Sequence, residues 1–556
     1  MALIMELYRL QKQHGYLRAA DLRDLAGRLQ VPLYRLQGLA SFYPHFRSTP
    51  PPAMEITVCR DMSCHLNGAP AFTRALETEF AVDCAAGQAE VRPVSCLGRC
   101  DNAPAACVNG WPLPATAKAA RLERARQVAA WARRPGGIPK ETTARAGRAW
   151  RVDPYGKPEE RYGILHRLTP PPTHDAAKPL SAREADPILA TLEEAGLRGM
   201  GGAGFPTATK WRLVRERSET PRYVVVNADE SEPGTFKDRV ILAELPHLVV
   251  EGAAVAGRVV GAAKVIIYIR HEYEPERRLL AREIERARAT GILPVPMEIF
   301  VSPGGYILGE ETALLEALED RRGEPRNKPP FPVSDGYQGR PTVINNVETL
   351  AMVPGILTRG AGWWQEQGQG GCSGLKFIAV SGEVERPGVH EIPLGLPLKD
   401  LIAAAGGVSG GRALAAVAPG GASSSFLPAC AMNTPLDFKA MEDAGSMLGS
   451  GAVVVMAEGT DLLDVAANVV AFFRNESCGK CVPCRTGTEK AVRILSDLQT
   501  GNGSRAQIDL LPLLGETLRL TSICGLGQVA LNPILSLLEH FPAAITSRLP
   551  GTSDQD

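Results

Sequence analysis

The chain has 556 residues, with 61 basic and 61 acidic side chains and a hydrophobic fraction of 44%. This balance of charge excludes a net electrostatic attraction to nucleic acid or to an anionic membrane. No run of about 18 apolar residues is present, so we expect no membrane span. The length predicts about three or four domains. The first residues lack the apolar core and cleavage site of a secretory signal, so we expect a cytoplasmic protein. In such a protein the twelve cysteines indicate metal ligands before disulfides.

The amino-terminal part of the chain divides into two small units. Leu3, Leu7 and Leu10 recur at helical spacing, which predicts a helical lead-in over residues 1–50. After a run of prolines, residues 51–115 follow a strand, helix, strand and hairpin pattern. This pattern predicts a small α/β domain.

The remaining chain predicts four further segments. Residues 116–180 read as an Ala/Arg-rich helix followed by a proline-containing linker. Residues 181–365 alternate helical stretches with short apolar runs such as RYVVVNA and AKVIIYIR, which is typical of buried parallel strands. Residues 366–445 predict a hairpin followed by a helix, a β-grasp-like unit. Residues 446–556 are helical apart from a cysteine loop.

Four cysteines near the carboxyl end have the spacing of metal ligands. They are Cys478, Cys481 and Cys484, spaced C-x2-C-x2-C, and the more distant Cys524. Four thiolates at such spacing hold iron–sulfur clusters. A structural zinc site is the alternative, but zinc sites usually divide their ligands two and two. We therefore favour a [4Fe-4S] cluster, which carries single electrons.

A second set of cysteines lies in the amino-terminal α/β unit. Cys59 and Cys64 follow its first predicted strand, and Cys96 and Cys100 follow its second. Both loops leave the same edge of the sheet, so the four thiolates can meet. The pairing suits a [2Fe-2S] cluster, with zinc as the alternative. The other four cysteines lack ligand spacing, and we interpret them as buried thiols: Cys84, Cys107, Cys372 and Cys430.

The segment GLRGMGGAGFPTATKW is rich in glycine and ends near Lys210. It contains a formal G-x-G-x-x-G at Gly199, Gly201 and Gly204, but a dinucleotide fingerprint needs a strand before it, and a helix-like stretch precedes it here. The exposed backbone N–H groups of such a loop can instead cradle a phosphate or lie against a ring. The alternative is a tight loop without a ligand.

Polar side chains follow the strand VVVNA, at the sheet edge where open α/β sheets bind ligands. They are Asn227, Asp229, Glu230 and Glu232, which suit hydroxyl, amide or ring N–H groups. The alternative is a solvated acidic turn.

Two further motifs carry groups suited to a cofactor. Gly309, Glu310 and Glu311 stand at the head of an apolar helix, where an anion is favoured. Asn345 and Asn346 offer amide groups in the segment VINNVETL.

Together these motifs resemble the NADH-binding flavoprotein subunit of respiratory complex I and its relatives in multisubunit enzymes. The matching segments, in the order of that family, are GLRGMGGAGFPTATKW, NADESEPGTFKDR, GGYILGEETAL, INNVETL, ESCGKCVPCRTGT and SICGLGQ. The amino-terminal part, with LQKQHGYL, SFYPHF and the two cysteine pairs, resembles the thioredoxin-like [2Fe-2S] subunit of the same enzyme. The chain thus resembles a fusion of both subunits.

The resemblance implies an α/β multidomain fold. It comprises a helical lead-in, a thioredoxin-like ferredoxin domain, a Rossmann-like domain for FMN and NADH, a β-grasp domain and a carboxyl-terminal helical bundle with a [4Fe-4S] cluster. The implied FMN-binding residues are Gly199, Gly201, Lys210, Asn227, Asp229, Tyr306, Gly309, Glu310, Asn345 and Asn346. The implied NAD(H)-binding residues are Phe205, Glu232, Glu311, Lys328 and Phe331.

Three positions depart from the family pattern. Met200 stands where the family commonly has Arg, Leu213 where it has an aromatic residue, and Val347 where it has Thr. These departures remove nucleotide contacts. A carboxylate at Glu232 would repel the additional phosphate of NADP, which favours NAD.

The implied chemistry needs no catalytic side chain, because hydride passes between NAD(H) and FMN and electrons then pass singly to the clusters. A partner must supply the other half-reaction. We expect a large subunit with a Mo/W-pterin site, which would make the chain the β subunit of an NAD-dependent formate dehydrogenase. The alternatives are a [NiFe] hydrogenase module and a complex I-type module. Two other classes of function stay open, an electron-relay subunit without flavin and a zinc-bound structural protein.

Overall fold

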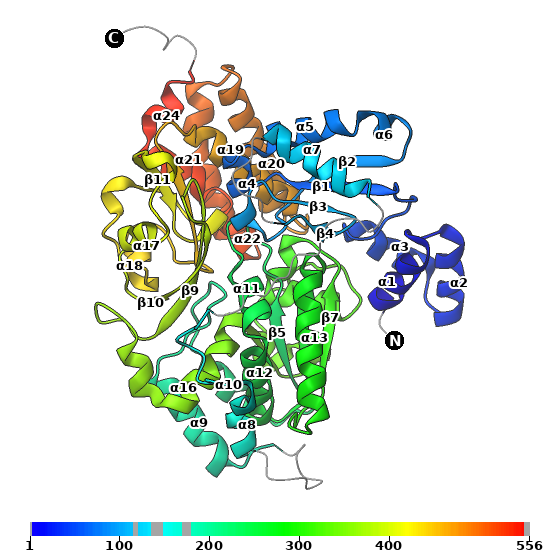
Figure 1. Cartoon of the computed structure of the whole chain (residues 1–556), viewed down its shortest axis with the longest axis vertical. Helices are drawn as coiled ribbons and strands as arrows, with labels where there is room; N and C mark the ends of the chain where they lie inside the picture. Colours follow the sequence, from blue (N-terminus) through cyan, green and yellow to red (C-terminus); the bar gives the residue numbers. More distant parts are fainter. Residues whose placement is uncertain (1–2, 115–120, 135–147, 169–178, 550–556) are drawn as a thin grey trace.

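The computed structural model describes residues 3–114, 121–134, 148–168 and 179–549. The prolines that we assigned to a linker, at 170–172, lie outside the described residues. The described residues form three sheets and two groups of helices, which confirms the predicted α/β multidomain class. Figure 1 shows the two amino-terminal units along one side of the molecule and the carboxyl-terminal helices at one end.

The helical lead-in contains α1 (Leu3–His14), α2 (Ala19–Leu29) and α3 (Leu33–Phe42). Its leucines are buried, as the helical spacing predicted. Hydrogen bonds join the lead-in to the central domain, two of them from α1. The backbone N–H of Ile4 donates to Asp320 Oδ1 at 2.8 Å, and Tyr8 OH donates to the carbonyl of Ser302 at 2.6 Å.

The first sheet has the order β2-β1-β3-β4. Its strands are β1 (Met54–Cys59), β2 (Ala89–Val94), β3 (Ala106–Val108) and β4 (Trp111–Pro112). The chain passes from β1 to β2 through the helices α4 (Met62–Leu66), α5 (Ala69–Glu79) and α6 (Ala81–Ala85). Because β1 and β2 are parallel, with Cys59 opposite Val94, the two cysteine loops leave the same edge. Helix α7 (Arg121–Ala132) packs on α5.

The central domain is built on a parallel sheet of order β7-β6-β5-β8. Its strands are β5 (Arg222–Ala228), β6 (Ala262–Arg270), β7 (Met297–Ser302) and β8 (Thr342–Asn346). Helices pack around it, among them α9 (Ala182–Glu194), α11 (Lys237–Glu244), α12 (Pro246–Val260), α13 (Glu274–Ala289) and α16 (Val347–Glu366). The strands are buried apolar runs, which is typical of parallel sheets covered on both faces.

The third sheet has the order β10-β9-β13-β11-β12. The predicted hairpin is confirmed as β9 (Leu375–Gly382) and β10 (Gly388–Pro393), followed by α17 (Leu398–Ala404). The other strands are β11 (Leu414–Ala418), β12 (Leu427–Pro428) and β13 (Ala452–Ala457). The sheet continues beyond residue 445, where we predicted this domain to end, because the all-apolar β13 is its central strand.

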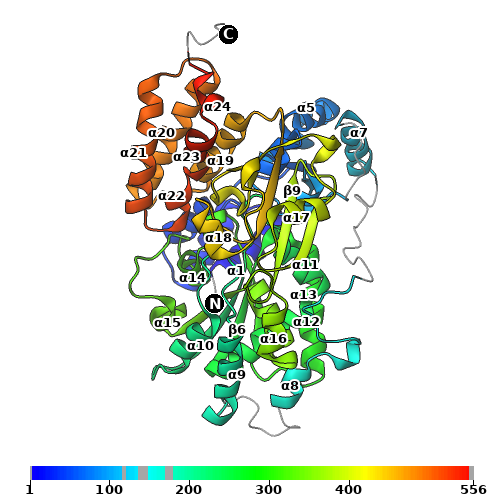
Figure 2. The same cartoon turned by 90° about the vertical axis from the view of Figure 1, so that its left-hand side faces the viewer.

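The carboxyl-terminal helices begin at α19 (Leu462–Glu476) and continue with α20 (Val482–Gln499), α21 (Arg505–Thr521), α22 (Gly525–Val529), α23 (Asn532–His540) and α24 (Pro542–Thr546). Figure 2 shows them gathered as a bundle above the central domain. Among the described residues, no single helix is long and apolar enough to cross a membrane; only α11 and α12 together, bent by 95°, reach that length and composition.

A buried charge network joins the central domain to the third sheet. Lys237 and Lys376 each contact Glu348 Oε2, at 2.9 and 3.0 Å, and all three side chains are fully buried. Lys237 also pairs with Asp238 at 2.7 Å. The other oxygen of Glu348 accepts from the backbone N–H of Phe377, in β9, at 2.8 Å. Glu348 therefore compensates two buried charges and holds the two domains together.

Replacement of Glu348 by Ala is expected to destabilise this domain contact by about 3–5 kcal/mol, because two buried ammonium groups lose their shared partner. Amide hydrogen exchange of Phe377 is the direct measurement, and its exchange should become faster. Glu366→Ala, at an exposed position of the same helix, is the control. Equal exchange rates in Glu348→Ala and wild type would contradict the assigned role.

Candidate functional site

The carboxyl edge of the parallel sheet brings together most of the predicted FMN-binding residues. Asn227, in β5, donates from Nδ2 to the carbonyl of Gly309 at 2.8 Å. Asn345, in β8, accepts from Trp211 Nε1 at 2.8 Å, and Asn346 caps α16 by accepting from the N–H of Glu348. Strands that are distant in the sequence thus present amide groups at a single edge, as the parallel topology requires.

The glycine-rich loop connects α9 to α10 (Thr207–Arg215), so no strand precedes it and it is no dinucleotide fingerprint. The N–H of Gly199 donates to the carbonyl of Phe205 at 2.8 Å, which closes the loop. The loop lies against the end of β8. A side chain at Gly201 would place its Cβ 3.1 Å from Cβ of Asn346. The glycine therefore allows the backbone to lie directly beside the amide edge.

Two lysines and two glutamates surround the start of α14 (Glu311–Leu318). Lys328 Nζ contacts Glu310 at 2.8 Å and Glu311 at 2.9 Å. Lys210 Nζ lies 3.9 Å from Glu311 and donates to the carbonyl of Ile344 at 3.0 Å. Burial lowers the pKa of Lys210, since only one distant carboxylate compensates its charge. An anionic group such as a phosphate would relieve this cost.

Asp229 follows β5 and is almost fully buried, and its Oδ2 has no hydrogen-bond partner in the described residues. Burial raises the pKa of Asp229 to about 7, although the nearby Arg270 charge opposes part of the rise. An unpaired buried oxygen is costly and is expected to have a partner. Thr207 Oγ1, also buried, likewise lacks one among the described residues. These orphaned polar atoms, with the amides and Lys210, fit a polar, anionic cofactor such as FMN.

The predicted NAD(H)-binding residues fall into two groups. Phe205 and Phe331 are unusually exposed for aromatic residues, at 44% and 52%. They flank α10 and α15 (Pro332–Asp335), which pack together, so both rings are available to stack on a planar ligand. Glu311 and Lys328 lie at the same helix start, in the charged group described above.

Glu232 is oriented differently. Its carboxylate accepts from the N–H of Ser423 at 2.9 Å and lies 3.4 Å from Ser450 Oγ, both in the third-sheet domain. Burial raises its pKa, and the bonds from Ser423 oppose the rise. The carboxylate therefore holds a domain contact.

The predicted [2Fe-2S] ligands converge as expected. Cys59, Cys64, Cys96 and Cys100 are buried, and the sulfur atoms of Cys96 and Cys100 lie 3.8 Å apart. Two sulfurs bonded to one tetrahedral metal at about 2.3 Å lie at about this separation. Hydrogen bonds that the Cys59 thiol donates to Cys64 and Cys96 raise the pKa of Cys59. The donor set therefore fits a metal centre, which would relieve this crowding.

The segment Cys96–Asp101 lies against the central domain. Arg99 is buried and donates to Glu276, in α13, at 3.1 Å, while Asp101 pairs with Arg239, in α11, at 2.6 Å. Gly98 lies so close to Tyr273 that a Cβ there would be 2.3 Å from the phenol oxygen. The loop of Cys96 is thus held against the central domain. The carboxyl edge of the parallel sheet in this domain, with Asn227, Asn345 and Asn346, is called the flavin edge below.

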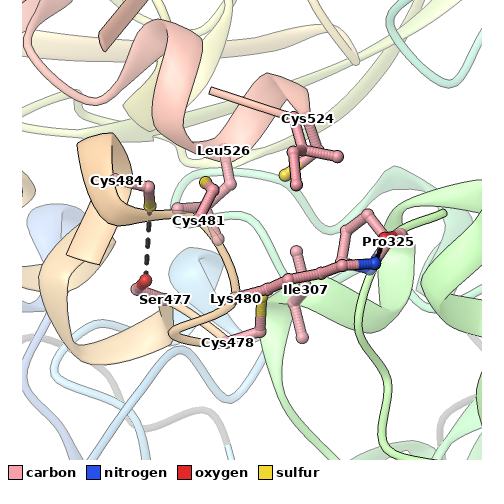
Figure 3. A pocket seen from close by; sticks show the side chains of 10 residues that line it. Ile307, Pro325, Ser477, Cys478, Lys480, Cys481, Cys484, Cys524 and Leu526 are labelled. Carbon is pink, nitrogen blue, oxygen red and sulfur yellow. Dashed lines mark hydrogen bonds between the residues drawn. The ribbon is translucent and has the colours of Figure 1, made fainter. Parts of the chain in front are cut away.

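The predicted [4Fe-4S] ligands line a small hollow. Figure 3 shows Cys478, Cys481, Cys484 and Cys524 around a common space that Ile307 and Leu526 border. Burial raises the pKa of Cys484 to about 11 and that of Cys524 to about 12. Thiols in such surroundings become thiolates only when a cation is bound, which fits a cluster.

The described residues contain no group of three or more Cys, His, Asp or Glu side chains placed to hold a single metal ion. A cluster binds its thiolates at separate corners, so its ligands lie further apart than those of one zinc ion.

Glu476 connects all three units, and it was not predicted from the sequence. It is the last residue of α19, just before the cysteine loop. One carboxylate oxygen accepts from Ser95 Oγ, beside Cys96, and the other accepts from the N–H of Tyr306 at 2.8 Å. The only sequence signal was its place beside Cys478 in the motif ESCG. Tyr306 itself packs on Phe472.

Four family descriptions match this chain. The Nuo51 FMN-binding domain matches residues 192–355, and the NADH-ubiquinone oxidoreductase-F iron-sulfur binding region matches 464–548. The thioredoxin-like [2Fe-2S] ferredoxin matches residues 1–125, and the SLBB domain matches 377–426. These matches confirm the predicted FMN, [4Fe-4S] and [2Fe-2S] cofactors.

Two sequence relatives illustrate the similarity, and both are F subunits of NADH-quinone oxidoreductases. The one numbered 2 in Rhizobium meliloti (strain 1021) is 41% identical over 382 residues, which cover 67% of this chain and 91% of the relative. The one in Mycobacterium tuberculosis (strain CDC 1551 / Oshkosh) is 41% identical over 379 residues, covering 66% of this chain and 85% of the relative.

Solved structures match over a greater length. A chain of the NAD+-reducing [NiFe]-hydrogenase in the air-oxidized state has a TM-score of 0.83 and 36% identity, and the match covers 98% of this chain and 93% of that one. The H2-reduced state of such an enzyme gives a TM-score of 0.84 at the same identity.

Replacement of Asp229 by Asn is expected to stabilise the flavin-free protein above pH 7. Because burial raises the pKa of Asp229 to about 7, the folded state retains a proton that the unfolded state has lost, so stability falls as pH rises from about 4 to 7. Each pH unit in this window costs about 1.4 kcal/mol at most. Thermal unfolding midpoints of variant and wild type should agree near pH 4 and separate towards pH 7.

Asp443→Asn, at an exposed site, is the control for this experiment. A difference between Asp229→Asn and wild type that does not depend on pH would contradict the assigned pKa.

Proposed function

We propose that this chain, which belongs to the family of NADH-quinone oxidoreductase F subunits, is a diaphorase that exchanges electrons between NAD(H), FMN and two iron–sulfur clusters. Its FMN-binding domain, [4Fe-4S] region and [2Fe-2S] domain supply the cofactor sites. The observation that carries the proposal is the junction between them. Glu476 contacts the flavin edge and the loop of Cys96, and it immediately precedes the loop of Cys478.

In the proposed flavin site, residues of this chain bind FMN and orient it. The N–H of Gly201 and the charge of Lys210 would hold the phosphate, and the amides of Asn227 and Asn346 would hold polar edges. Bound FMN supplies the exchange between two-electron and one-electron transfer. The exposed rings of Phe205 and Phe331 would stack on the nucleotide.

The proposed cluster ligands are the two sets of four cysteines. Cys59, Cys64, Cys96 and Cys100 would hold the [2Fe-2S] centre, and Cys478, Cys481, Cys484 and Cys524 the [4Fe-4S] centre. The second set borders the flavin edge through Ile307, which neighbours Tyr306. This placement supports electron exit through the [4Fe-4S] centre.

We favour an NAD-reducing hydrogenase as the type of assembly to which the chain belongs. The hydrogenase chain is matched over 98% of this chain, including the amino-terminal [2Fe-2S] part, whereas the NADH-quinone oxidoreductase relatives cover about two thirds. The formate dehydrogenase that we predicted from the sequence stays an alternative, as does a complex I-type module. Purification with the native partners and metal analysis separates them: nickel supports the first, and molybdenum or tungsten the second.

Phe205→Ala is expected to raise the KM for NADH by about 3- to 10-fold with little change in FMN content, because it removes a stacking contact of about 0.5–1.5 kcal/mol. NADH-dependent dye reduction measures this effect. Tyr34→Ala removes a similarly exposed aromatic ring on α3 and should leave KM unchanged. A loss of FMN with unchanged KM would place Phe205 at the flavin instead.

Three exposed apolar side chains on α20 and α21 form a candidate docking surface for the partner that exchanges electrons with this chain. Val482, Leu513 and Leu520 are each at least 60% exposed, which is unusual for large apolar side chains. Leu513→Glu with Leu520→Glu should abolish co-purification of the partner and leave NADH-dependent dye reduction intact. Leu122→Glu is the control. Retention of the partner by the double variant would show that docking occurs elsewhere.

A further inference from the structure

Arg270, the last residue of β6, joins the flavin edge to the [2Fe-2S] loop. It is 2% exposed. Its guanidinium donates to the carbonyl of Cys96 at 2.6 Å and also to the carbonyl of Glu230, in the loop that carries Asp229. One side chain of the central domain thus bonds the backbone of a proposed cluster ligand and the backbone of the proposed flavin site.

The bond to the Cys96 carbonyl places the charge of Arg270 beside this proposed cluster ligand. An arginine keeps its charge even when buried. A buried charge is weakly screened, so it stabilises negative charge on neighbouring sulfur strongly.

Two other charges of this loop are paired with charges of the central domain. Arg99 pairs with Glu276, and Arg239 pairs with Asp101. Arg270 pairs with Glu272 at 2.8 Å, but the glutamate side chain is 20% exposed and the arginine 2%. Water therefore screens the carboxylate more than the guanidinium, and a positive field remains at Cys96.

We propose that Arg270 is a positioning residue that raises the reduction potential of the [2Fe-2S] centre and ties this centre to the flavin loop. The step concerned is a one-electron reduction of the cluster by the NADH-reduced enzyme. It adds one negative charge to the centre and neither forms nor breaks a covalent bond. The charge of Arg270 stabilises the reduced state, because the potential of such a centre depends on nearby charge. The inference rests on the proposed [2Fe-2S] ligands and not on the identity of the partner.

The test is a redox titration of the [2Fe-2S] EPR signal in the purified holoenzyme. Arg270→Gln should lower the ratio of reduced to oxidised centre at a fixed potential by tenfold or more, which is about 59 mV for one electron. Arg270→Lys keeps the positive charge but loses the second hydrogen bond of the guanidinium, so the ratio of reduced to oxidised centre should change less than in Arg270→Gln. Glu272→Gln removes the opposing charge and should shift the ratio in the opposite direction.

Arg215→Gln is the matched control, because Arg215 also donates to two backbone carbonyls, those of Val259 and Leu180. These lie near the amino end of β6, whereas Arg270 is at the carboxyl end. The control and the [4Fe-4S] signal should not shift.

An unchanged [2Fe-2S] ratio in Arg270→Gln would overturn the inference. So would shifts of the same sign in Arg270→Gln and Glu272→Gln, since these would indicate a loosened loop instead of a charge effect. If Arg270→Gln fails to retain the cluster, Arg270→Lys and Glu272→Gln decide by the same criteria. Absence of a [2Fe-2S] signal from the wild-type enzyme would instead refute the proposed centre.

Discussion

The loop that follows β5 depends on the buried side chain of Glu230. Its carboxylate accepts from the N–H groups of Asp238 and Arg239 at the start of α11, and from Tyr273 OH at 2.9 Å. Its backbone carbonyl accepts from Arg270. Burial, together with the neighbouring charge of Asp238, raises the pKa of this carboxyl to about 7. The bonds hold the loop that follows β5 against α11 and against Arg270, which in turn bonds the loop of Cys96.

Buried charge is the general means by which the domains of this chain are joined. The Glu348 network joins the central domain to the third sheet, and the Arg99–Glu276 pair joins it to the [2Fe-2S] domain. Breaking such a pair costs several kcal/mol, because the remaining group stays buried and unpaired. Electron transfer requires cofactors at fixed separations, and these directional contacts fix the separations more closely than apolar packing alone.

Much of the site could be predicted from the sequence. The spacing of eight cysteines grouped them into the two sets that the structure brings together, and the strand ends predicted that Asn227, Asp229, Asn345 and Asn346 share one sheet edge. Arg270, Glu476 and Lys376 could not be identified as contacts between domains, because each bonds a group from a remote part of the chain. The contact between Glu232 and the third-sheet domain could not be predicted either, because its carboxylate accepts a hydrogen bond from the N–H of Ser423, which is remote in the sequence.

The sequence by itself determined the cofactor chemistry, because thiolate spacing, glycine at close backbone contacts and apolar strand runs are local properties. It also determined the two fused units, through motifs in the order of one family. Only the tertiary structure decided which side chains lie between the cofactor sites. Which side chains lie there depends on how the separate domains pack against one another. The sequence around a charged residue at a strand end is the same whether that residue faces water or a cysteine loop of another domain.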